Sequence, residues 1–228
     1  MKPLRIWSMP MTVKSLEPQQ ERSRESLRRL LKAAAEVLGQ HGLAGATIPR
    51  IASHASLTPG AVYRRFRNKD VLLETMIVQI MEDQDRYIRQ SITATMAAEI
   101  PTTVLAGQVI NNLLISYRRN AGLLRAVRQF VQGREGSPFW KKATKLEMRT
   151  VEYVVDLLVT SKGEIKRANP RVAVGLGLAM VAGALWELVV NSPNAKMWRG
   201  LVPGNDKELQ QELTRSFLSY LVIEPGNT

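Results

Sequence analysis

The 228-residue sequence contains no cysteine and only two histidines, His41 and His54. Without cysteine there is no disulfide framework and no thiolate to act as a nucleophile or metal ligand. Two histidines are too few for a typical zinc site, so we expect both to be structural or surface residues. No phosphate-binding loop or nucleophile elbow is present, and Gly175 and Gly177 lack the strand that a dinucleotide fingerprint requires. We therefore expect a cytoplasmic protein that is not an enzyme and has no cofactor or metal.

Long hydrophobic runs are also scarce. The exception, residues 172–186, is almost wholly apolar but is bracketed by Arg171 and Glu187. It falls short of the ~20 residues that span a bilayer, so we expect a helix buried on several sides. Its small residues would let another helix pack closely; they are Gly175, Gly177, Ala179, Ala182 and Gly183. With the helix expected near 209–220, it is predicted to form half of a four-helix dimer interface. The alternative is a core helix within one chain.

Positive charge is plentiful and unevenly distributed. The formal net charge is +12. Residues 1–69 hold 13 Lys and Arg against 4 Asp and Glu, a net +9, while the rest holds 19 against 16, a net +3. This asymmetry is typical of a phosphate-binding module joined to a nearly balanced one. A basic membrane-surface segment is the competing interpretation, but the charges lie on short helices and not on one long amphipathic helix.

Two short helices with a tight turn are predicted within residues 47–69. Thr47 is a natural N-cap for the first helix, which has Pro49 in its first turn. Ser56 and Leu57 form the turn, and Thr58 caps the second helix. Within that helix Val62 and Phe66 lie four residues apart and share the apolar face.

The opposite face of the second helix combines small residues with cations. Pro59, Gly60 and Ala61 allow close approach of a backbone, and Tyr63, Arg64 and Arg65 follow. This arrangement is typical of a helix whose front end meets base edges in the major groove of DNA. A helix pair with a merely solvated basic face is the alternative.

The spacing of these residues resembles the N-terminal domain of TetR (tetracycline repressor)-like transcription regulators over about residues 27–75. The positions that match are Leu38, Gly42, Thr47, Ile51, Ala52, Ala55, Thr58, Gly60, Tyr63, Phe66, Lys69 and Leu72. Ser56 departs from the family pattern, which usually has Gly in the turn. Arg64 and Arg65 stand where the family often has aromatic residues or His, so the operator sequence cannot be borrowed from a relative.

Periodic apolar residues predict helices over the rest of the chain, with no convincing strand. We expect an irregular arm over residues 1–25, which is either disordered or reaches along DNA with Arg22 and Arg24. A first helix is predicted over 26–41, ended by Gly42. Further helices are predicted at 68–92, 102–119, 123–131, from 138, from 170 and from 205 or 206 to 222. The predicted domains are the arm (1–25), a helix-turn-helix domain (26–72) and a helical effector-binding and dimerisation domain (73–228).

The sequence thus predicts an all-α homodimer that binds a palindromic DNA operator, by resemblance a ligand-released repressor. Five residues are expected to contact mainly phosphates: Thr47, Arg50, Thr58, Tyr63 and Lys69. Pro59, Gly60, Ala61, Arg64 and Arg65 are expected to face bases. A largely apolar effector is expected among Asn111, Phe130, Trp140, Met148, Tyr153, Met180 and Trp186, although any of these can simply be core. An activator of the same fold, or a helical ligand-binding protein without specific DNA binding, is the alternative.

Overall fold

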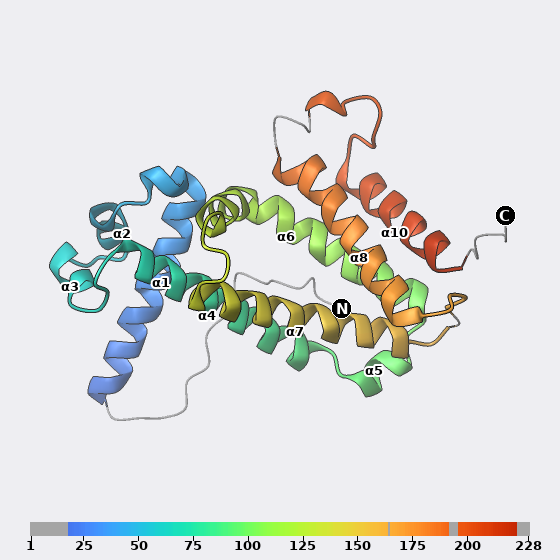
Figure 1. Ribbon diagram of the computed structural model, residues 1–228, viewed down its shortest axis with the longest axis horizontal. Helices are drawn as coiled ribbons and strands as arrows, with labels where there is room; N and C mark the ends of the chain where they lie inside the picture. Colours follow the sequence, from blue (N-terminus) through green and yellow to red (C-terminus); the bar gives the residue numbers. More distant parts are fainter. Residues whose placement is uncertain (1–17, 164, 192–195, 223–228) are drawn as a thin grey trace. The chain divides into compact units, whose positions relative to one another are not determined.

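The computed structural model describes residues 18–163, 165–191 and 196–222, which form helices and no β-strand (Figure 1). The predicted all-α class is therefore confirmed. The helices are α1 (Pro18–Gly45), α2 (Ile48–His54), α3 (Pro59–Tyr63), α4 (Lys69–Ser91), α5 (Ala94–Ala98), α6 (Thr102–Val131), α7 (Pro138–Thr160), α8 (Pro170–Leu185), the π-helix η1 (Trp186–Val190) and α10 (Asp206–Val222).

The described residues divide into two compact units. The N-terminal unit combines residues 18–84 with 120–146, and the C-terminal unit combines 85–119 with the described part of 147–222. Helices α4, α6 and α7 each contribute residues to both units.

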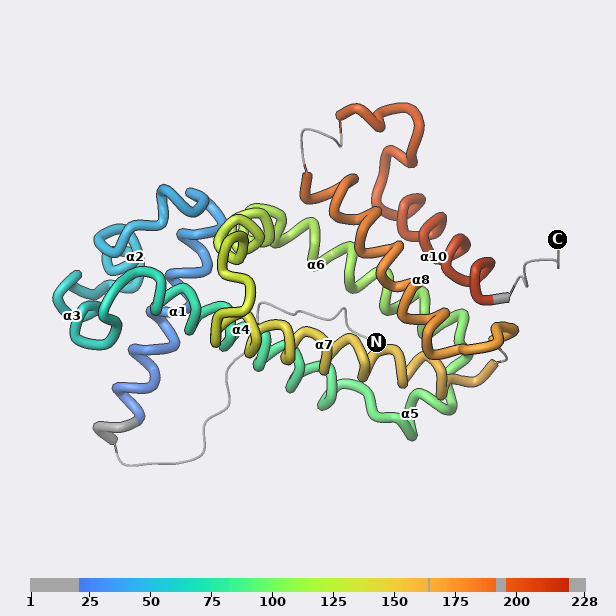
Figure 2. The backbone as a smooth tube through the Cα atoms, viewed as in Figure 1, coloured from blue at the N-terminus to red at the C-terminus, as the bar shows by residue number. Residues whose placement is uncertain are grey.

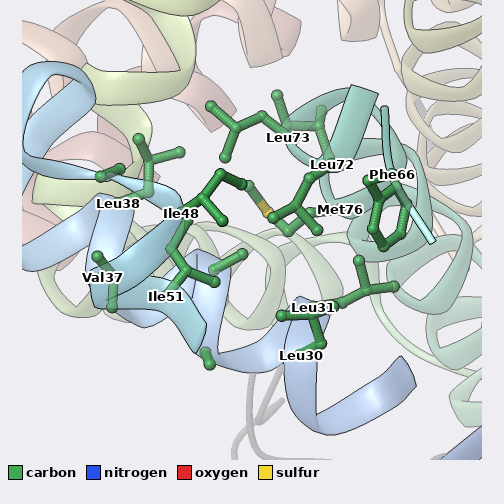
Figure 3. Packing of buried hydrophobic residues seen from close by; sticks show 14 of the residues in the cluster. Leu30, Leu31, Val37, Leu38, Ile48, Ile51, Phe66, Leu72, Leu73 and Met76 are labelled. Carbon is green, nitrogen blue, oxygen red and sulfur yellow. The ribbon is translucent and has the colours of Figure 1, made fainter. Parts of the chain in front are cut away.

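The core of the N-terminal unit gathers side chains of α1, α2, α3 and α4, part of which Figure 3 shows, together with side chains from the parts of α6 and α7 in that unit. The predicted stripe on α1 is buried at Leu31, Ala34 and Leu38, with Leu27 packed at its edge. The other large side chains of this core include Leu30, Ile51, Phe66, Leu72, Leu73 and Met76. Burying such side chains contributes about 1.5–3 kcal/mol each, so this core fixes the helix pair on a stable base.

Helix α1 is longer than predicted. It begins at Pro18, eight residues before the expected start, so the expected irregular arm is wrong for residues 18–25. Gly42 interrupts the helix with a φ of 65°, the left-handed region that favours glycine, as expected of a residue that ends a helix. The predicted function of residues 1–17 lies outside the described residues.

Helix α6 joins two helices that were predicted to be separate. It runs from Thr102 to Val131 and is kinked at Asn120, where φ is −112° and ψ is 16°. Beyond the kink Gly122 crosses α1 so closely that an added Cβ would lie 2.2 Å from the Gly39 carbonyl oxygen. The predicted break between residues 119 and 123 is therefore wrong, and Gly122 lies within one helix against the backbone of α1.

In the C-terminal unit α8 and α10 run side by side (Figure 2). A Cβ added to Gly177 would lie 2.7 Å from the Phe217 ring, so glycine is what permits this contact. The guanidinium of Arg167 packs over the Tyr220 ring, 4.3 Å from its centroid. The short helix α5, absent from the prediction, is capped by Thr93, whose hydroxyl accepts from the Met96 N–H.

A buried carboxylate fastens α4 to α7 within the C-terminal unit. The Asp85 side chain is 6% exposed, accepts from Arg89 Nε at 3.1 Å and accepts from Arg149 Nη2 at 2.7 Å. The Thr150 hydroxyl donates to it as well, at 3.1 Å. Burying a carboxylate is costly unless each lone pair finds a donor, which is the case here.

Helix α8 and η1 together form a stretch of 21 residues, Pro170–Val190, that is long and apolar enough by composition to cross a membrane. Core helices of soluble proteins meet the same criterion. Here one side of the stretch enters the core of the C-terminal unit through Ala173, Val174, Leu178, Val181 and Leu185.

Candidate DNA-binding surface

Local hydrogen bonds shape the predicted helix pair. The Thr47 hydroxyl accepts from the Arg50 N–H at 3.4 Å, and the Thr58 hydroxyl accepts from the Ala61 N–H at 3.2 Å. Both threonines are therefore N-caps, as predicted. Between the helices Ser56 has a φ of 56°, so a serine adopts the left-handed conformation for which glycine is usual.

Helix α3 has one buried side and one exposed side. Val62 is fully buried and Phe66, just beyond the helix, is 7% exposed, whereas Tyr63 is 56% exposed. Arg64, Pro59 and Gly60 are exposed as well, and a Cβ added at Gly60 would meet nothing within 4 Å. The outer side of α3 thus presents a smooth front end followed by a phenol and a guanidinium. Such a surface can approach the base edges in the major groove of DNA closely.

Two of the predicted phosphate contacts also hold the backbone of the N-terminal unit. Lys69 Nζ donates to the Leu43 carbonyl oxygen at 3.2 Å, and Arg50 Nη1 donates to the Gly45 carbonyl oxygen at 2.6 Å. An ammonium has three donors and a guanidinium five, so each retains donors for a phosphate oxygen. The bonds restrict both cations before any ligand arrives, which lowers the entropy that binding would cost.

Arg65 is placed differently from its neighbour Arg64. Its Nη1 donates to the Ser26 hydroxyl at 3.3 Å and its Nη2 to the Ser23 hydroxyl at 3.4 Å. These partners lie on α1, and nothing in the sequence pattern connects them with α3. An arginine about forty residues from two serines is a common occurrence in sequences, so the spacing could not have predicted the contact.

The surroundings of the histidines fit the structural role expected for them. His54 Nε2 lies 2.9 Å from Glu36 Oε2, which joins α2 to α1. His41 is exposed at the end of α1. In the described ranges no group of three or more His, Cys, Asp or Glu could hold a metal ion.

The residues expected to bind an effector are divided between the two units. Phe130 is buried in the core of the N-terminal unit, edge-on to Phe139 at 5.9 Å between ring centroids, and Trp140 lies half-buried in the same unit. Five residues lie in the C-terminal unit, where Met148 and Met180 are each 48% exposed and Asn111, Tyr153 and Trp186 are half-buried. The Tyr153 hydroxyl donates to the Ile92 carbonyl oxygen at 2.8 Å.

Two polar groups of α6 in the C-terminal unit were given no site role from the sequence. Gln108 Oε1 is buried and has no hydrogen-bond partner within the described part of the chain. Burial, followed by the nearby Glu147 carboxylate, raises the pKa of Tyr117 above its ordinary value of 10.0. Tyr117 therefore stays protonated at neutral pH and can donate a hydrogen bond.

The residues of this surface match a known family model. The family described as "Bacterial regulatory proteins, tetR family" matches residues 30–76, which include α2, α3 and the start of α4. The transcriptional regulator BetI of Paraburkholderia phytofirmans is 25% identical over 175 residues, covering 69% of this chain and 78% of its own. BetI 2 of Chromohalobacter salexigens is 43% identical over 61 residues, covering 26% and 30% of the two chains.

Solved structures share the fold beyond this segment. The regulator FadR of Bacillus subtilis, in complex with stearoyl-CoA, superposes with a TM-score of 0.61 at 17% identity, covering 86% of this chain and 97% of FadR. A TetR family transcription regulator of Marinobacter aquaeolei superposes with a TM-score of 0.58 at 13% identity, covering 90% and 100%. Residues 30–76 therefore match the family model of the tetR regulators, and the fold of the chain is similar to that of solved transcriptional regulators, one of them of the TetR family.

Proposed function

We propose that the protein is a cytoplasmic, homodimeric repressor that binds a palindromic operator and leaves it when a small molecule binds. The observation that carries the DNA-binding part is the arrangement of α3, where Tyr63 and Arg64 point outward while Val62 and Phe66 are buried. In this proposal residues 26–72 are the DNA-binding domain and residues 73–228 bind the effector and the second protomer.

The proposed contacts divide into two classes. Arg64 and the small residues Pro59, Gly60 and Ala61 face base edges, because a guanidinium can bond bidentately to guanine and small residues permit close approach. Thr47, Arg50, Thr58, Tyr63 and Lys69 bind phosphates and fix the register of α3 in the groove. Arg65, already bonded to α1, supports the surface from the side of α3 and is moved from the base-facing class to this supporting role.

An exposed apolar strip on α8 supports the proposed homodimer. Val172, Leu176 and Met180 are 63%, 51% and 48% exposed and lie four residues apart, on one side of the helix. Exposed apolar strips of this kind mark protein interfaces. Two copies joined through α8 and α10 would have to present their α3 helices about 34–36 Å apart to enter successive major grooves.

Ligand release follows from reciprocity between the two binding sites. A small molecule that favours a dimer with another spacing of the α3 helices opposes DNA binding, typically by about 1–3 kcal/mol. Helices α4, α6 and α7 contribute to both units and would transmit the change. FadR, which has a similar fold, is solved with stearoyl-CoA. In this chain Gln108 Oε1, buried without a partner among the described residues, is a candidate polar group for the effector, beside the residues expected from sequence.

A mobility-shift assay with the DNA upstream of the protein's own gene tests the DNA-binding part. Specific binding is expected to survive excess competitor DNA at two salt concentrations, whereas a merely basic surface would release DNA as salt rises. Loss of all binding on addition of competitor would support the helical ligand-binding alternative.

Replacing Arg64 by Ala tests its assignment to bases. Preference at one base position of each half-site is expected to fall by about 1–3 kcal/mol, measured as relative affinities for a set of single-base operator variants. Equal weakening on every sequence would make Arg64 a phosphate ligand. A reporter gene behind the operator distinguishes repression from activation, and a thermal-shift screen identifies the effector through stabilisation.

A further inference from the structure

The first turns of α1 lie outside the segment that defines the family. The helix begins at Pro18, whereas the family match begins at residue 30. Figure 1 shows these turns extending past α2 and α3 within the same unit. The core of that unit begins at Leu27 and Leu30, so the turns before them add almost nothing to it. Contacts outside that core therefore have to hold these turns.

Arg65 ties these turns to the recognition helix. Its two terminal nitrogens donate to the hydroxyls of Ser26 and Ser23, which lie one helical turn apart on the same side of α1. The partners are 39 and 42 residues distant in sequence, so the contact is tertiary. Since Arg65 directly follows Arg64, whatever Arg65 holds lies next to the surface that meets DNA in the proposed function.

The remaining sides of the same turns carry exposed cations. Arg22, Arg24 and Arg29 are exposed, and over residues 21–29 four arginines stand against two glutamates, a net +2. Arg22 and Arg29 are seven residues apart and share one flank of the helix, about 10 Å apart along its axis. Ser23 and Ser26 occupy the adjoining side, so this flank borders the edge of the α1 helix that is bonded to Arg65.

We propose that the first turns of α1, here called the α1 extension (residues 21–29), form a second DNA contact, in which Arg22 and Arg29 bind phosphates flanking the base pairs that α3 reads. Arg65 is the positioning residue, because its bonds to Ser23 and Ser26 fix the extension beside α3. The inference rests on the proposed function. The contact adds affinity without base specificity, because arginines bound to phosphates do not distinguish one base pair from another.

Duplex length separates this contact from the operator contact. One duplex ends at the outermost base pairs that α3 reads, and a second extends about ten base pairs beyond each of these ends. For the R22A/R29A variant, affinity for the long duplex is expected to fall. The slope of its log K against log salt is expected to flatten by about 0.9 for each phosphate that the variant no longer neutralises. Binding to the short duplex should match wild type. The K196A/R199A variant removes two exposed cations from the C-terminal unit and should leave both duplexes unaffected.

The S23A/S26A variant tests the positioning role of Arg65, because it keeps every arginine. The ratio of the affinities of S23A/S26A for the long and the short duplex should fall towards the ratio of R22A/R29A. The sequence preference of S23A/S26A on the short duplex should be retained. Circular dichroism and the melting temperature confirm that each variant folds.

If R22A/R29A binds the long duplex as tightly as the wild-type protein at every salt concentration, the α1 extension is not a DNA contact. A full long-duplex advantage in S23A/S26A would overturn the role of Arg65. Either result leaves the proposed function standing if wild-type protein still selects its operator over competitor DNA. Failure of that selection sinks the proposed function itself.

Discussion

Among single residues, Ser56 stands where the backbone between α2 and α3 requires a positive φ of 56°. An L-residue in the left-handed region costs about 1–2 kcal/mol, whereas glycine adopts it freely. Ser56→Gly is therefore expected to raise the free energy of unfolding by about 0.5–1 kcal/mol, after allowance for the greater freedom of glycine in the unfolded chain. Urea unfolding measures the change, and operator affinity should stay the same. A lower unfolding midpoint would mean that the hydroxyl contributes more than the strain costs.

Gly60 gives a prediction in which stability and binding separate. A Cβ there meets nothing within 4 Å, so Gly60→Ala should fold normally and gain up to about 1 kcal/mol of helix propensity. In the proposed complex the added methyl would stand between α3 and the base edges, so operator affinity should fall about tenfold or more in a mobility-shift titration. Gly204→Ala, also in open space but in the C-terminal unit, is the control and should bind normally. Unchanged affinity of Gly60→Ala would remove Gly60 from the interface.

Local chemistry and long-range contact explain which site features could be predicted from the sequence. The caps Thr47 and Thr58 were predictable because each acts on an N–H three residues away. The partner of Arg65 could not be predicted, since it lies about forty residues away and depends on how α1 packs. The partner of Lys69, Leu43, is 26 residues away and could not be predicted for the same reason.

Among helices, the crossing of α1 and α6 tolerates no added atom at one glycine. The Cβ of Gly122→Ala would lie 2.2 Å from the Gly39 carbonyl oxygen, which forces the helices apart. We expect a loss of about 1–3 kcal/mol in unfolding free energy, against the up to ~1 kcal/mol that alanine normally adds to a helix. Gly39→Ala is the matched control, because its nearest new contact is 3.4 Å away, and it should be close to neutral. Equal stability of the two variants, by thermal unfolding, would contradict this crossing.

Helix boundaries were predictable where proline or a capping residue marks them. The starts of α4, α7, α8 and α10 were predicted to within one residue or so, and Pro138 and Pro170 are first residues of their helices. The start of α1 was missed because residues 18–25 are polar and show no apolar period. The continuity of α6 was missed because Gly122 is a helix breaker in isolation. Its tight packing on Gly39 outweighs the propensity cost of about 1 kcal/mol.

For the whole molecule, the exposed strip on α8 predicts the effect of a charge at its centre. Leu176 is 51% exposed in the single chain, so Leu176→Glu should leave the fold intact. In the proposed dimer the carboxylate would be buried without a partner, so sedimentation should show monomers at micromolar concentration. Operator affinity should fall with dimerisation, because one α3 reaches only one half-site. Lys162→Glu, an exposed charge change off this strip, serves as control and should remain dimeric. A dimeric Leu176→Glu protein would place the interface elsewhere.

The Asp85 cluster has a consequence for sequence change over evolutionary time. Both carboxylate oxygens of Asp85 are occupied by arginines from α4 and α7, and removing one partner of such a group leaves the other without compensation. Replacing the whole group by apolar side chains of similar volume is far less damaging. Positions 85 and 149 should therefore covary among relatives, with substitutions at one rarely found unless the other has changed too. An aligned set of homologues in which Asp85 varies freely beside an invariant Arg149 would contradict that coupling.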